Sequence, residues 1–270
     1  MAPAIGPGLG VSFCRRAAGP DVDVLALIAR MAVPPDAARA KLIAALVRDL
    51  KSSGVWQTLD GLYVMAAHDA QAARLNWRGD LLNLTPAASP IFTADRGYQG
   101  DGAAAYLAID NADANAIRFT ENGASIGVWL NVCTAEQRNV LGRTDNGALQ
   151  LMPLSAADTI TGRMQTVSGS QQTTIVAGYT GRGMTRMTRE VIGQYYLRPH
   201  GLARALRTVP AASGNPRRPH RFLAGINTSG TMLFSTARIA VGYFGGALTN
   251  VQEVAMDAAL QTYLSAVGGA

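Results

Sequence analysis

Apolar residues recur at helical spacing over the first quarter of the chain. A first apolar stripe ends before Asp36, which can cap the helix that follows it. A third stripe begins near Val55 and extends through Ala66, although Gly61 weakens it. The spacing therefore predicts a compact group of short helices over residues 21–76, preceded by a flexible arm over residues 1–20 that is rich in Gly and Pro.

Beyond Trp77 the pattern changes to short apolar runs separated by turn residues about every ten positions, which is typical of a β-sandwich or jelly roll. In residues 125–132 apolar and other residues alternate, so Ile126, Val128, Leu130 and Val132 are expected to face a core. We therefore predict a two-sheet antiparallel sandwich within residues 77–248. The candidate strands are residues 104–109, 125–133, 140–143, 148–154, 159–167, 173–177, 187–197, 203–209, 222–226 and 238–244.

A final helix is predicted over residues 249–270. Thr249 and Gln252 have the spacing of a capping box. An apolar stripe follows, and we expect it to pack this helix on the sandwich. Its members are Val251, Val254, Ala255, Ala258 and Thr262. The predicted fold class is α+β, with short N-terminal helices, an antiparallel β-sandwich and a C-terminal helix.

Composition excludes several classes of protein. A chain of 270 residues with 48% hydrophobic content is an ordinary globular sequence rather than a disordered one. Cys14 and Cys133 are far apart, and with three scattered histidines they form neither a disulfide framework nor a structural zinc site. No apolar run is long enough to span a membrane, and the first residues lack a secretory signal, so we expect synthesis and folding in a reducing cytoplasm.

The net charge of +6 is concentrated in one segment. Residues 181–221 contain nine arginines and a single acid, Glu190, whereas the rest of the chain carries a net charge of −2. Apolar residues alternate with these arginines, which indicates strands with arginines on their outer faces. Because the chain has few lysines and no recognised nucleic-acid-binding motif, we do not expect a nucleic acid as partner.

One cluster in the basic segment has a composition suited to binding a glycan. Aromatic rings stack on sugars, and Arg and His donate to hydroxyl, carboxylate or phosphate groups. The alternative is that one tyrosine packs inward and the arginines solvate an exposed sheet. The candidate glycan-binding residues are Tyr195, Tyr196, Arg198, His200, Arg217, Arg218 and His220.

A second candidate site would hold calcium. The run of residues 110–115 (DNADAN) supplies oxygen ligands at alternating positions, and its candidate calcium ligands are Asp110, Asp113 and Asn115. Asp95 and Asp101 could join them if the fold brings them close. The alternative is an Asx-rich loop without a metal. No other cofactor is expected.

No catalytic constellation is recognisable in the sequence. A β-sandwich glycosidase would be expected to carry two carboxylates on one strand, and the candidate strands lack such a pair. A P-loop and an H-E-x-x-H motif are also absent. We therefore predict that the chain is not an enzyme.

Several stretches resemble phage and prophage structural proteins in which a small helical segment precedes a concanavalin A-like (laminin G-like) β-sandwich. These are residues 54–63 (GVWQTLDGLY), 70–77 (AQAARLNW), 97–102 (GYQGDG) and 238–244 (RIAVGYF). The resemblance implies a jelly roll of the concanavalin A-like lectin type and a virion context. Spike or fibre proteins of gene transfer agents are a narrower possibility.

The resemblance implies a non-enzymatic virion component, such as a spike, fibre or decoration protein, whose lectin-like domain could bind host surface polysaccharide. The expected partners are other virion proteins, further copies of the chain and host polysaccharide, without membrane insertion. The expected location is the virion, assembled in the bacterial cytoplasm. A stand-alone carbohydrate-binding module and a polysaccharide depolymerase are the alternatives.

Overall fold

The computed structural model describes residues 21–143, 149–165, 171–174, 177–208, 218–227 and 229–270. The predicted N-terminal arm lies outside these residues. No helix in the described parts of the chain has the length and apolar character needed to cross a bilayer. The helices are α1 (Val22–Ala29), α2 (Ala37–Ser52), α3 (Val55–Thr58), α4 (Ala112–Asn115) and α5 (Asn250–Val267), with a short 3₁₀ turn at Ala72–Arg74.

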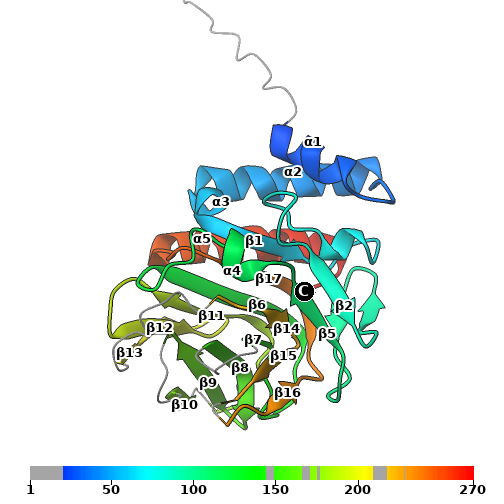
Figure 1. Ribbon diagram of the computed structural model, residues 1–270. Helices are drawn as coiled ribbons and strands as arrows, with labels where there is room; N and C mark the ends of the chain where they lie inside the picture. Colours follow the sequence, from blue (N-terminus) through cyan, green and yellow to red (C-terminus); the bar gives the residue numbers. More distant parts are fainter. Residues whose placement is uncertain (1–20, 144–148, 166–170, 175–176, 209–217, 228) are drawn as a thin grey trace, which may run out of the picture.

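The strands form two large antiparallel sheets and one small sheet (Figure 1). The eight-stranded sheet has the order β13-β12-β11-β6-β17-β4-β3, with β1 also paired to β17. Its strands are β1 (Leu59–Val64), β3 (Ile91–Thr93), β4 (Gly97–Gln99), β6 (Ala124–Val132), β11 (Gly183–Arg189), β12 (Gln194–Arg198), β13 (Ala205–Thr208) and β17 (Arg238–Gly245).

The seven-stranded sheet has the order β10-β9-β8-β7-β14-β5-β2. Its strands are β2 (Leu84–Ala87), β5 (Tyr106–Ile109), β7 (Leu141–Gly142), β8 (Leu149–Ala156), β9 (Thr159–Met164), β10 (Gln171–Thr174) and β14 (Arg221–Phe222). The small sheet pairs β15 (Ala224–Ile226) with β16 (Met232–Phe234).

The main core lies between the inner faces of the two large sheets. The ring of Phe222 in β14 meets the edge of the Tyr63 ring in β1, with ring centroids 5.4 Å apart. The Tyr195 hydroxyl in β12 donates to the Gly162 carbonyl in β9 at 3.0 Å. As predicted, Ile126, Val128 and Leu130 are fully buried, whereas Val132 is only half-buried at the end of β6. The sheets therefore pack face to face, as in a β-sandwich.

The outer face of the eight-stranded sheet is covered by helices. Helix α5 lies along this face, and α2 and α1 lie above it (Figure 1). Met256 and Leu260 of α5 are fully buried, and the Tyr263 ring packs against Trp77 at 5.9 Å. The capping box forms as predicted, with Thr249 N–H donating to Gln252 Oε1 at 3.0 Å and Gln252 N–H to Thr249 Oγ1 at 3.3 Å.

The predicted third helix is wrong beyond Thr58. Residues Leu59–Val64 form β1, which pairs antiparallel with β17 and is buried at every position. An apolar run buried on both faces fits a strand as well as a helix, so spacing alone does not separate the two. A glycine is needed in β1 because a Cβ at Gly61 would lie 2.7 Å from the Phe244 ring.

Other boundaries also differ from the predictions. The single strand predicted over residues 187–197 is two strands, β11 and β12, joined by a turn in which Gly193 has φ 77°. Short strands β2, β3, β4 and β16 were not predicted. The antiparallel sheets, few helices and closing helix are confirmed, whereas the jelly-roll type and the domain boundaries stay predictions.

Replacement of Gly242 by Ala tests the packing between the sheets. A Cβ at this position would lie 2.4 Å from the nearest atom of the Phe222 ring, so we expect a loss of about 1–3 kcal/mol in the free energy of unfolding. Gly79→Ala is the matched control, because nothing lies within 4 Å of a Cβ there. Urea denaturation of both variants checks this, and equal midpoints would contradict the packing described.

Candidate functional site

A depression of about 560 Å³ lies where the β12–β13 loop meets the start of α5. We call it the α5 depression. Among its described lining residues two are arginines and none is acidic, and each arginine pairs with an acid just outside the lining. The lining residues are Arg198, Gly201, Leu202, Ala203, Arg204, Asn250 and Val254.

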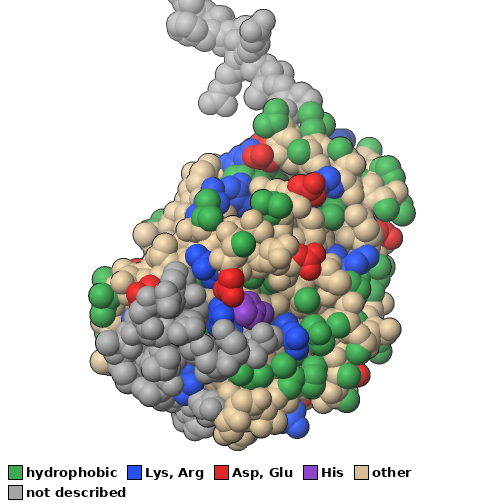
Figure 2. Space-filling model, viewed as in Figure 1, with side chains coloured by type: hydrophobic (Ala, Val, Ile, Leu, Met, Phe, Trp, Pro, Cys, Tyr) green, Lys and Arg blue, Asp and Glu red, His purple; other side chains and the backbone are tan. Residues whose placement is uncertain are grey.

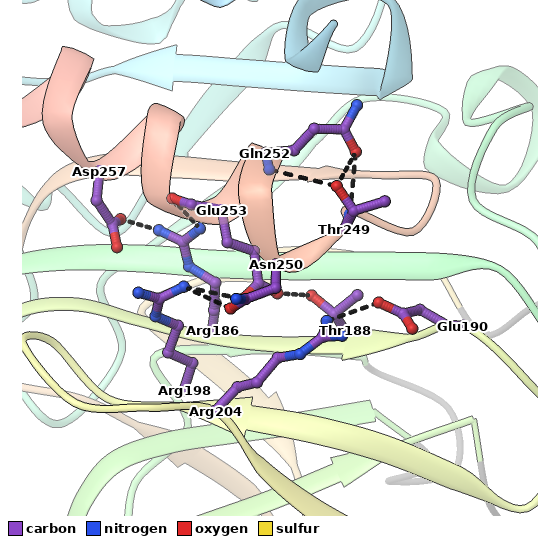
Figure 3. A network of polar contacts seen from close by, with 10 residues as sticks. All are labelled: Arg186, Thr188, Glu190, Arg198, Arg204, Thr249, Asn250, Gln252, Glu253 and Asp257. Atoms are coloured by element: carbon purple, nitrogen blue, oxygen red, sulfur yellow. Dashed lines mark hydrogen bonds and ion pairs between the residues drawn. The ribbon is translucent and has the colours of Figure 1, made fainter. Parts of the chain in front are cut away.

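Arg198 is held in place by the first turns of α5. Its Nη1 donates to Asn250 Oδ1 at 3.3 Å and to Glu253 Oε2 at 3.4 Å. Glu253 is fully buried, and its other carboxylate oxygen accepts a hydrogen bond from Thr188 Oγ1 at 2.7 Å (Figure 3). The carboxylate therefore joins two strands of the sheet to the helix and restricts where the Arg198 guanidinium can lie.

A fully buried arginine, Arg186, lies beneath α5. It pairs with Asp257 and donates from Nη1 to the backbone carbonyl of Glu253 at 3.0 Å (Figure 3). Burial raises the pKa of Asp257, while the adjacent Arg186 acts in the opposite direction. These contacts connect the middle of the outer sheet face to α5 through charges that have lost most of their water.

Arg204 lies at the rim of the α5 depression. Its Nη1 contacts Glu190 Oε1 at 2.6 Å, and its guanidinium carbon lies 3.9 Å from the centroid of the Tyr196 ring. The guanidinium therefore covers one face of that ring. Tyr196 positions Arg204 by a cation–π contact and does not offer that face to a sugar.

The structure divides the seven predicted glycan-binding residues between two places. Tyr196, Arg198 and His200 lie on β12 or directly after it, and the His200 ring packs against Trp129 with centroids 5.0 Å apart. Tyr195 is fully buried and points between the sheets. It is the inward-facing tyrosine that the alternative reading expected.

The other members of the set lie beside α4, except Arg217, which is outside the described residues. His220 Nε2 contacts Asp113 Oδ2 at 3.0 Å, and Arg143 Nη1 contacts Asp113 Oδ1 at 3.0 Å. Arg218 Nε donates to the Ala116 carbonyl at 2.5 Å. Figure 2 shows a histidine on this face of the molecule with basic and acidic side chains beside it.

This geometry does not favour calcium at the predicted ligands. Burial acts to raise the pKa of Asp113, but Arg143 and His220 outweigh it and lower that pKa, so the carboxylate already faces cationic groups. Asp110 accepts from Thr85 Oγ1 at 2.9 Å, and the Asn115 amide donates to the Asn111 carbonyl at 3.3 Å. Within the described residues, no three His, Cys, Asp or Glu side chains gather as metal ligands.

The two further acids proposed for that site have other partners. Asp95 pairs with Arg39 at 2.6 Å. Asp101 accepts three backbone N–H bonds, each 2.8 Å long, from Ala103, Ala104 and Ala105. The calcium assignment stays a prediction.

The arginines of the basic segment are not all on outer, solvated faces, which corrects the sequence interpretation. Arg186 and Arg189 are both fully buried. Arg186 lies on the outer face, where α5 covers it, whereas Arg189 donates from Nη1 to the Met164 carbonyl at 3.1 Å. The alternation of residues along a strand predicts on which side of the sheet a side chain lies. It does not predict whether a helix covers that side.

Sequence reasoning missed the contribution of α5 to the site. The predicted stripe places Val251 and Val254 against the sandwich, but these residues are 77% and 48% exposed. The buried face instead carries Glu253 together with Met256 and Leu260. The helical spacing could have revealed this, because Glu253 lies three residues before Met256 and seven before Leu260, which places all three on one face of the helix. The prediction missed it because an acid was not expected on a buried face.

Comparisons with known proteins show a likeness of fold. No family model and no curated protein sequence matches the chain. A Trypanosoma rangeli sialidase structure aligns with TM-score 0.55 and 13% identity over 83% of this chain and 40% of its own. A mutant of that sialidase displaying trans-sialidase activity aligns with TM-score 0.54 and 13% identity, over 83% of this chain and 39% of its own. A mutant of HCR/D aligns with TM-score 0.51 and 11% identity, over 74% of this chain and 52% of its own.

This likeness corrects the prediction that the chain is not an enzyme. The same fold occurs in chains named as sialidases, so the missing catalytic motif does not remove the enzyme class from consideration. The present chain spans about two fifths of those sialidases, and the identity is low, so the fold is what they share. None of the three structures is described as a phage or virion protein.

Replacement of Glu253 by Ala tests the buried network. Removal of the carboxylate leaves Arg198 and Thr188 without their buried acceptor, so we expect a loss of about 3–5 kcal/mol in the free energy of unfolding. Glu253→Gln keeps an acceptor for Thr188, so its loss in the free energy of unfolding should be clearly smaller than that of Glu253→Ala. Chemical denaturation measures both, and an unaffected Ala variant would show that the carboxylate does not hold α5 on the sheet.

Asp101 should make stability dependent on acid pH. Its three backbone hydrogen bonds lower its pKa from 3.8 to about 2. Because the folded-state pKa is depressed, the stabilisation is present above the unfolded-state pKa and disappears as pH falls from about 4 towards 2. The stability difference between the wild type and Asp101→Ala should therefore shrink over that range. A difference independent of pH would contradict this assignment.

Proposed function

We propose that the chain is a carbohydrate-binding domain of the concanavalin A-like lectin type, and that the α5 depression binds an acidic sugar. The observation that carries this proposal is the pair of arginines, Arg198 and Arg204, in a hollow whose described lining contains no acid. A guanidinium presents paired N–H donors that match the two oxygens of a carboxylate.

The contacts of Arg204 leave room for a ligand. Its present partner, Glu190, is a surface residue on the β11–β12 turn, and an ion pair that remains partly open to water contributes little to folding. A sugar carboxylate can therefore replace Glu190 at small cost. The start of α5 also favours an anion, because the helix dipole places partial positive charge there.

The remaining lining suits the rest of a sugar. Asn250 offers an amide near the Arg198 guanidinium, and Val254 offers an apolar surface. One of the sialidase structures is described in complex with a difluorinated nononic acid, so a protein that contains this fold binds an acidic sugar. That likeness supports the choice of ligand class and assigns no residue.

The wider context is also a proposal. A spike, fibre or decoration role in a virion, with host polysaccharide and other virion proteins as partners, rests on the sequence resemblance. The alternative that the chain is a stand-alone carbohydrate-binding module is supported by the α5 depression alone. A polysaccharide depolymerase is the enzymatic alternative, and the sialidase likeness is the observation that favours it.

The test compares Arg204→Ala with the matched control Arg48→Ala. Arg48 lies on α2 with its side chain 70% exposed and pairs with its neighbour Asp49, so its loss removes the same charge elsewhere. The probes are a sialic acid polymer and, as the uncharged reference, dextran. We expect Arg204→Ala to weaken binding of the acidic polymer about tenfold or more, because a hydrogen bond to a charged group contributes about 1.5–3 kcal/mol. Arg48→Ala should bind as the wild type does.

The same samples separate the alternatives. Equal binding by Arg204→Ala and the wild type, with both folded, would contradict the assignment of the site. Equal binding of dextran and the acidic polymer would contradict the ligand class. Release of reducing sugar during the incubation would assign the chain to the depolymerases.

A further inference from the structure

A second pocket, of about 260 Å³, lies between the start of β1, the segment before β2 and the segment after α4. It shares no lining residue with the α5 depression. Its volume is slightly below the ~300–1,000 Å³ typical of sites for drug-sized ligands, which suits a single small group. The residues that matter here are Asp60, Arg78, Leu81, Asn115, Ile117 and Arg118.

Arg78 is fixed in position before any ligand arrives. Its guanidinium carbon lies 4.6 Å from the centroid of the Trp56 ring, and its Nε donates to the Leu59 carbonyl at 3.2 Å. Its backbone N–H donates to Oδ1 of the buried Asn76 at 3.0 Å. Among the described residues, none accepts a hydrogen bond from its two terminal nitrogens.

Arg118 faces the same pocket and is anchored by Asp60. The buried Asp60 carboxylate accepts the backbone N–H of Arg118 at 2.9 Å and that of Phe119 at 2.7 Å. It also contacts Arg118 Nη1 at 3.4 Å. In the described part of the chain the remaining side-chain nitrogens of Arg118 have no acceptor, and the side chain is 40% exposed.

The two guanidinium groups repel each other across the pocket. Burial lowers the pKa of Arg78, and the nearby positive charge of Arg118 lowers it further, while Asp23 and Asp60 oppose this shift without cancelling it. Asp60 is occupied by backbone donors, and the exposed Asp80 pairs at 3.5 Å with Arg30. The repulsion between Arg78 and Arg118 would be offset by an anion that contacts both.

The rim of the pocket has a different character. Leu81 and Ile117 line it and are 63% and 68% exposed, so they offer apolar contact to a ligand. The amide nitrogen of Asn115 donates to Asn111, whereas its oxygen has no donor among the described residues and can accept from a hydroxyl. These features of the pocket match an acidic sugar, which combines a carboxylate for the arginines, an apolar C–H face for Leu81 and Ile117, and hydroxyls for Asn115.

We propose that this pocket is a second binding site, for a sugar that carries a carboxylate. The carboxylate lies between Arg78 and Arg118, a hydroxyl donates to Asn115, and the C–H face of the ring packs on Leu81 and Ile117. The site stands on its own contacts and does not depend on the proposed ligand of the α5 depression. If both sites are occupied, one acidic glycan chain or two can be held at once.

The experiment is calorimetric titration of the full chain with glucuronate. Glucose, which lacks the carboxylate, and acetate, which lacks the ring, are the reference ligands. Arg118→Gln is the main variant, because Asp60 keeps its backbone donors, and Arg78→Gln is the second. Arg48→Gln controls for the loss of charge, and Arg204→Ala identifies binding at the α5 depression.

With Arg204→Ala as the common background, we expect glucuronate to bind at least tenfold more weakly once Arg118→Gln or Arg78→Gln is added, whereas adding Arg48→Gln should leave its binding unchanged. Glucose and acetate should each bind at least tenfold more weakly than glucuronate. Undetectable glucuronate binding, or binding unchanged by Arg118→Gln, would overturn the proposal. Loss in Arg204→Ala alone would also overturn it while leaving the α5 depression as the site. Equal affinities for acetate and glucuronate would contradict the assignment of a sugar as the ligand, because the carboxylate alone would then account for binding.

Discussion

The position of α5 on the eight-stranded sheet is the constraint on which the rest of the structure depends. That face of the sheet carries Arg186 and Thr188, polar residues that a helix can cover only if their hydrogen bonds are satisfied. Glu253 and Asp257 meet this requirement from α5. Since breaking a buried ion pair costs far more than breaking an exposed one, the network fixes the rotation and height of the helix.

The location of the α5 depression follows from this packing. With Glu253 turned inward, Asn250 and Val254 face the β12–β13 loop, and Arg198 is drawn to the helix. The residues then divide by role. Buried charges hold the geometry, whereas Arg204 and Arg118, which keep part of their surface in water, retain donors that a ligand can use. The same principle describes both pockets, although different segments build them.

Elements with one decisive local signal could be predicted from the sequence. The alternation around Val128 and the capping box at Thr249 needed no distant contact to be recognised. β1 could not be separated from a helix, because its pairing with β17 joins residues as far apart in sequence as Leu59 and Gly245. The site was predicted only in part for the same reason. Tyr196, Arg198 and His200 are close in sequence and stay together on or just after β12. Arg218 and His220 instead contact residues in or beside α4, which only the tertiary fold determines.

The central claim is that partly exposed arginines recognise an acidic sugar through charge. The most direct test is the affinity of the wild type for a sialic acid polymer as salt rises from about 0.1 M to about 1 M, over which the screening length falls from about 10 Å to about 3 Å. The account predicts a steep loss of affinity over that range, with any weak binding of dextran unchanged. An affinity for the acidic polymer that does not depend on salt would contradict it.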